Sequence, residues 1–181
     1  MSLNQSLIES NIGALDEGAQ LLSLIEADQY TKGFKPAFQS TIGAHFRHLL
    51  EHYRCFLAQI HSGEFCYDRR ERDQLLECDR EYARTTIKEL IDQLRELDCE
   101  LFTKEYFVQD QQFPERVDTS LHRELLFLQS HTVHHYAIIG AMTRAFGKRP
   151  DEDFGVAIAT QEHQKSCTKD QPIGESPSCA Q

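Results

Sequence analysis

LHRELLFLQSHTVHHYAIIGAMTRAF, residues 121–146, has the periodicity of one long amphipathic helix. Its apolar residues recur at intervals of three and four positions, as one face of an α-helix requires: Leu121, Leu125, Leu128, Ile138, Ile139, Met142 and Phe146. The run Asp118–Ser120 offers helix-capping side chains just before it, and Gly147 followed by Pro150 ends it. The pattern therefore predicts a helix over residues 120–146.

The middle of this predicted helix carries three histidines. His131 and His135 are four residues apart, so their side chains project from one face, roughly 6 Å apart at Cβ. His134 points about 100° away from His135. Two neutral imidazoles one turn apart, facing a core, can supply two ligands of a metal site. The alternative is a pair of core histidines bonded to backbone or to carboxylates.

Three further stretches show helical periodicity, near residues 3–27, 37–61 and 79–101. Four long amphipathic helices with little strand signal predict an all-α fold, a four-helix bundle with a long connection between helices 2 and 3. That connection, over residues 62–76, is polar, and segments of its length serve as lids, crossovers or solvated loops. The stretch Phe107–Gln109 is a candidate for one short strand.

The second predicted helix holds three more histidines, His45, His48 and His52. His48 and His52 lie on one edge of its apolar face, and His45 lies nearer the centre of that face. Six of the nine histidines thus fall near the middles of two predicted helices. Packed helices of similar length bring their midpoints together, which favours one shared site.

The composition limits the class of protein. The chain has 181 residues and a net charge of −10, which predicts one globular domain and argues against binding to nucleic acid. No apolar run approaches the ~18 residues of a membrane span, and residues 1–5 lack a signal-peptide pattern, so we expect a cytoplasmic protein without membrane contact. The six cysteines include no Cys-x-x-Cys pair and are expected to be reduced thiols. We predict a helical domain over residues 1–163 and a disordered polar tail over 164–181.

Two segments of the chain resemble the DinB/YfiT-like superfamily. They are TIGAHFRHL, residues 41–49, and SHTVHHY, residues 130–136, and the resemblance in helix order and length covers roughly residues 3–150. The resemblance implies a four-helix bundle in which three histidines bind one divalent metal, here His48, His131 and His135. Because His45 and His52 flank His48, it stays open whether either joins the metal ligands. An all-histidine set suits zinc, nickel or iron.

The resemblance also implies a class of reaction. Similar proteins include thiol S-transferases and isomerases that use low-molecular-weight thiols such as bacillithiol or mycothiol, and the metal-binding domain of sulfoxide synthases. The leading expectation is therefore a metal-dependent enzyme, a thiol S-transferase acting on a small molecule. The alternatives are a metal-dependent hydrolase and a non-catalytic bundle that uses the metal for stability or serves as an interaction module. A homodimer is also left open.

Five residues outside the histidines are candidates for the site. Glu124 lies seven residues before His131 on nearly the same helical face, where it can orient a ligand imidazole or act as a base. The alternative for Glu124 is burial beside Arg47 or a histidine. In the connection after the second helix, four side chains are candidates to bind substrate, with the arginines suited to a carboxylate-bearing thiol: Tyr67, Asp68, Arg70 and Arg72.

Overall fold

The structure, a computed structural model, describes residues 2–33, 35, 37, 39–112 and 115–169, and it is mostly helical. The helices are α1 (Leu3–Leu24), α2 (Ala27–Thr31), α3 (Ile42–Gln59), α4 (Gln74–Cys78), α5 (Arg80–Arg95), α6 (Leu121–Ala145) and α7 (Ile158–Lys169). Two 3-10 turns and three short strands join them: η1 (Tyr67–Arg69), η2 (Cys99–Thr103), β1 (Glu64–Phe65), β2 (Tyr106–Val108) and β3 (Val117–Thr119). The prediction of a helical fold is confirmed.

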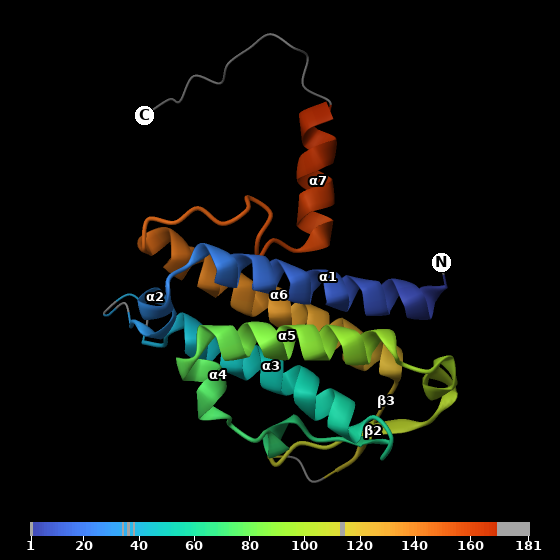
Figure 1. The fold of residues 1–181 in the computed structure, drawn as a ribbon. Coiled ribbons are helices and arrows are strands. Elements are labelled where there is room, and N and C mark those ends of the chain that lie inside the picture. Colours follow the sequence, from blue (N-terminus) through green and yellow to red (C-terminus); the bar gives the residue numbers. More distant parts are fainter. Residues whose placement is uncertain (1, 34, 36, 38, 113–114, 170–181) are drawn as a thin grey trace.

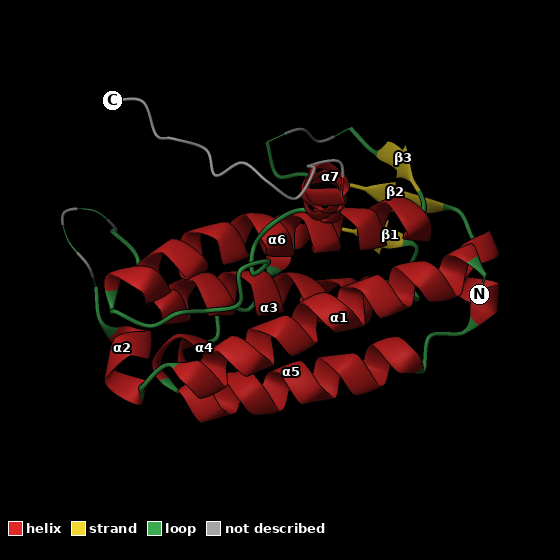
Figure 2. Ribbon diagram, turned by 90° about the horizontal axis from the view of Figure 1, so that it is seen from above, coloured by secondary structure: helices red, strands yellow, loops and turns green. Residues whose placement is uncertain are grey.

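The four longest helices, α1, α3, α5 and α6, lie side by side (Figures 1 and 2). Both α1 and α3 contact α5 and α6. Their apolar faces meet in one core, in which Leu15, Phe46 and Leu125 are fully buried. The pairing of α3 with α6 matters for function, because these helices carry the histidines singled out above. Among the described helices, none is long and apolar enough to cross a membrane.

Local capping explains where these helices begin. The side chains of Ser2, Thr41 and Ser120 accept hydrogen bonds from backbone amides in the first turns of α1, α3 and α6. The Thr41 cap corrects one expectation, because helix α3 begins at Ile42 and not at residue 37. Phe38, which the helical pattern had included, lies outside the described residues.

Short elements interrupt the long connection expected over residues 62–76, and one of them, β1, belongs to a small sheet. Strand β1 pairs in parallel with β2, and β2 pairs antiparallel with β3. The expected strand at Phe107 is part of β2. Phe65 stacks between Phe56 of α3 and Tyr106 of β2, with ring centroids 5.4 and 5.3 Å away. This packing anchors the segment that leads into η1, beside the histidines.

Helix α7 projects away from the four long helices (Figure 1). It includes residues 164–169, the first part of the segment expected to be a disordered tail. Residues 170–181 lie outside the described residues. The proposed division of the chain after residue 163 stays a prediction.

A buried polar network joins α1, α3 and α6 directly behind the histidines. Asn11 Nδ2 donates to the Leu125 carbonyl (3.1 Å), and Tyr53 Oη donates to Asn11 Oδ1 (2.9 Å). Thr132 Oγ1, one residue from His131, lies 3.2 Å from Tyr53 Oη. Since all three side chains are fully buried, each group has only protein partners within reach.

We expect Asn11→Leu to lower the free energy of unfolding by about 2–6 kcal/mol, because two buried groups lose their partners at about 1–3 kcal/mol each. Urea denaturation measures this change. Gln20→Leu, at an exposed position of the same helix, should stay within about 0.5 kcal/mol of the parent. Equal effects of the two substitutions would show that the network adds nothing to stability.

Candidate metal centre

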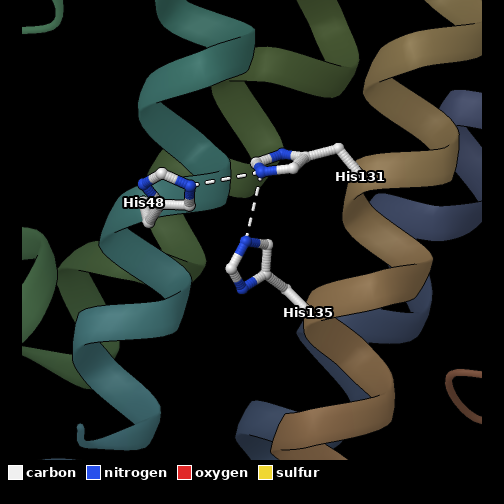
Figure 3. Close-up of side chains that lie close together, drawn as sticks. All are labelled: His48, His131 and His135. Atoms are coloured by element: carbon white, nitrogen blue, oxygen red, sulfur yellow. Dashed lines mark hydrogen bonds between the residues drawn. The ribbon is translucent and has the colours of Figure 1, made fainter.

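Three imidazoles converge between α3 and α6. Figure 3 shows His48 projecting from α3 toward His131 and His135 of α6. His131 Nε2 lies 3.2 Å from His48 Nε2 and 3.1 Å from His135 Nε2. One nitrogen from each ring can be chosen so that all three lie within 4.8 Å of one another. The side chains are half-buried, so the cluster is sheltered without being sealed.

This donor set fits a metal ion better than it fits hydrogen bonding. Nitrogen ligands bind zinc at ~2.0–2.1 Å, which places two ligands of a tetrahedral ion about 3.3 Å apart. The two distances at His131 Nε2 are close to that value. A neutral imidazole nitrogen carries either one proton or one lone pair. His131 Nε2 can therefore form a hydrogen bond with only one of the two nitrogens that face it, either His48 Nε2 or His135 Nε2. A cation among the three nitrogens satisfies all three lone pairs.

The surroundings keep these rings neutral at pH 7. Burial lowers the pKa of His48 and of His131 to about 4, and that of His135 to about 3. Positive charge adds to the effect, because each ring lies beside other histidines and both His48 and His131 lie near Arg70. A neutral imidazole has the free lone pair that a metal requires.

The other histidines of the two helices take different places. His45 Nδ1 lies 3.0 Å from His135 Nδ1, on the side of that ring opposite His131. His52 is buried, and its Nδ1 donates to the His48 carbonyl (2.7 Å), so it is a satisfied core histidine. His134 is exposed. Its ring lies edge to face against His135, with centroids 5.3 Å apart, but it is not one of the three rings that converge.

The comparisons with known proteins identify the family of this chain. The family model described as "DinB family" matches residues 1–168. The chain belongs to the DinB family. Its fold is similar to the crystal structure of a DinB-like protein, YjoA from Bacillus subtilis, with a TM-score of 0.60 at 15% identity over 78% of this chain and 92% of that chain. An identity this low shows a shared fold alone. No curated protein sequence matches the chain.

Glu124 of this DinB family member is buried, but its partners are not those expected. Tyr67 Oη donates to Glu124 Oε2 (2.7 Å), and Thr119 Oγ1 donates to Oε1 (2.6 Å). Arg47, one expected partner, instead forms an ion pair with Glu77. The expectation of pairing with Arg47 or a histidine is therefore wrong. Glu124 holds the Tyr67 side chain, which packs on His52, and its role as a base or in orienting a ligand ring stays a prediction.

Tyr67 and Arg70 lie beside His52, whereas Asp68 and Arg72 have other surroundings in the described part of the chain. The Tyr67 ring stacks on His52 with centroids 5.4 Å apart, and Arg70 Nη1 lies 3.5 Å from His52 Nε2. Asp68 accepts a hydrogen bond from the Gln111 amide (3.0 Å). Arg72 is exposed and has a φ of 59°. Binding of substrate by these four residues stays a prediction.

Phe127, a neighbour of the cluster, and Glu51, a neighbour of Arg70, escaped the sequence reasoning. The Phe127 ring stacks on His131, with centroids 5.5 Å apart and an interplanar angle of 17°. Its position four residues before His131 was the available signal, because such pairs share a helix face. Glu51 is buried, accepts the Asp73 amide (2.5 Å) and lies 4.0 Å from Arg70 Nε. No sequence signal distinguished Glu51 from a solvated glutamate.

Proposed function

We propose that this DinB family protein binds one divalent transition metal through His48, His131 and His135, and that it is a metal-dependent thiol S-transferase. The convergence of three neutral imidazoles on one point, at 3.1 and 3.2 Å from His131 Nε2, is the observation that carries the proposal. Zinc, nickel and iron all suit the ligand set. In this proposal the four long helices act as a four-helix bundle around the metal, as in other bundle proteins with sites between facing helices.

Three protein ligands are the pattern of a catalytic site, since a tetrahedral ion keeps a fourth position for substrate. A bound divalent metal supplies a Lewis acid there, which lowers the pKa of a thiol or a water molecule. The residues of the chain supply the rest. Phe127 and His52 pack against the His131 ring and hold its orientation. Tyr67, anchored by Glu124, packs against both and shields that side from water.

The position of Arg70 favours an anionic substrate. Its guanidinium is held by the Tyr67 carbonyl (2.5 Å from Nη1) and lies beside His52. Together with the Glu51 carboxylate, 4.0 Å from Arg70 Nε, these contacts hold the guanidinium close to the histidine cluster. A guanidinium recognises carboxylates, so it favours a thiol that carries a carboxylate group.

The test combines metal content with activity. Protein purified without a histidine tag is expected to contain about one equivalent of a transition metal by elemental analysis. Loaded with that metal, it should transfer low-molecular-weight thiols to an electrophile faster than the metal-free protein does. Bound metal with hydrolysis of ester or amide substrates, and no thiol transfer, would replace the proposal with a hydrolase. Bound metal with neither reaction would favour a non-catalytic bundle, and absence of metal would end the proposal altogether.

A further inference from the structure

His135 has a neighbour at each of its two ring nitrogens. Its Nε2 faces His131 Nε2 at 3.1 Å, inside the cluster, and its Nδ1 faces His45 Nδ1 at 3.0 Å, outside it. The two rings are tilted by 49°, with centroids 5.2 Å apart. His45 comes from the first turn of α3 and His135 from the middle of α6, so the contact spans the two helices that build the cluster.

The proton on this contact can be assigned by chemistry. If His135 binds a metal through Nε2, its neutral ring carries the remaining proton on Nδ1 and donates it. His45 Nδ1 must then accept with its lone pair, which places the His45 proton on Nε2. A metal-bound histidine usually donates its second N–H to a carboxylate, a carbonyl or water, and such acceptors orient the ring and raise its basicity.

We propose that His45 is a positioning residue for the metal, the hydrogen-bond acceptor that holds His135 in its ligating orientation. This inference rests on the proposed metal site. The contact is specific to His135. The corresponding outer nitrogen of His131, Nδ1, is buried without a hydrogen-bond partner in the described part of the chain. His52 cannot take the same role, since its Nδ1 already donates to the His48 carbonyl.

Replacing His45 by asparagine or by leucine, two side chains of nearly equal size, distinguishes loss of the hydrogen-bond acceptor from loss of packing. Asparagine places Oδ1 close to the position of the histidine Nδ1 and can still accept, whereas leucine fills the space without accepting. In the full-length protein we expect His45→Leu to raise the dissociation constant of Zn²⁺ by about 10- to 100-fold, measured by competition with a chelator. His45→Asn should stay within about threefold of the parent. Both variants should still bind one equivalent at saturating Zn²⁺.

The control is His134→Leu. This histidine touches the same His135 ring, edge to face with centroids 5.3 Å apart, but it is exposed on the outer side of α6. The His134→Leu variant should bind Zn²⁺ with a dissociation constant within about threefold of that of the parent. If His45→Leu and His45→Asn both match the parent, the inference fails while the metal site stands. If the parent itself binds no Zn²⁺, the inference and the proposed function fail together.

A second measurement avoids substitution, in case the leucine variant does not fold. Nitrogen-detected NMR of the Zn²⁺-loaded parent, labelled with ¹⁵N in histidine, reports which ring nitrogen carries each proton. We expect His135 to be protonated on Nδ1 and His45 on Nε2. A proton on Nδ1 of His45 would overturn the inference, because that nitrogen could then not accept the bond.

Discussion

Replacing His131 and His135 together by alanine is expected to abolish stoichiometric metal binding. The double variant keeps only His48 of the three converging imidazoles, and one neutral ring cannot compete with water for a divalent ion. Elemental analysis should find about one equivalent of metal in the parent and less than about a tenth of that in the variant. The single substitutions His48→Ala, His131→Ala and His135→Ala should each remove most of the metal.

The matched control is His134→Ala, in the same helix but exposed. It should keep the metal of the parent, as should His52→Ala, whose ring is engaged with the His48 carbonyl. His45→Ala should keep one equivalent at saturating metal and release it more readily. If the double variant retained its metal, the ligands would have to lie elsewhere in the chain. Loss of metal from His52→Ala but not from His48→Ala would place the α3 ligand one turn further along.

The metal-free protein is expected to lose stability steeply in mild acid. Burial lowers the pKa of His48, His52 and His131 from the ordinary 6.5 to about 4, and that of His135 to about 3. Nearby positive charges lower these pKa values further. Below pH 6.5 these histidines bind protons in the unfolded chain, whereas in the folded protein they remain neutral. Stability therefore falls from about pH 6.5 to about pH 3–4 and levels off below, where both states are protonated. We expect the melting temperature to drop by at least about 5 °C between pH 7 and pH 5.

Calorimetry at several pH values measures this dependence. The His131→Ala, His135→Ala double variant provides the control, because it lacks two of the four imidazoles whose pKa is lowered and should show a flatter profile between pH 7 and pH 5. A parent protein whose melting temperature is constant over this range would show that the rings reach water freely when protonated. The same slopes in parent and variant would assign the acid sensitivity to other groups.

Local features of the sequence were enough to predict the helices and two of the converging rings. Apolar periodicity and capping residues such as Ser120 act within one or two turns, so they can be recognised without knowledge of the fold. The four-residue spacing of His131 and His135 puts them on one face for the same reason. The resemblance to the DinB family added His48, and the structure brings it to the other two.

Contacts between distant segments were decided only by the tertiary structure. The parallel pairing of Glu64 with Phe107 joins positions 43 residues apart, and neither two-residue β1 nor three-residue β2 has a periodicity of its own to reveal it. Glu124 meets Tyr67 and not Arg47 because the strands and η1 carry Tyr67 back over α6.

The contact of His45 with His135 has the same origin. On α3 alone, His45 belongs to the apolar face and resembles any core histidine, because helical periodicity says only that a side chain points inward. Which atom it meets depends on how α3 and α6 are rotated and shifted against each other, and that is set by packing of the whole core. The sequence by itself determined which faces are buried, and only the packed helices decided that His45 Nδ1 lies 3.0 Å from the outer nitrogen of His135.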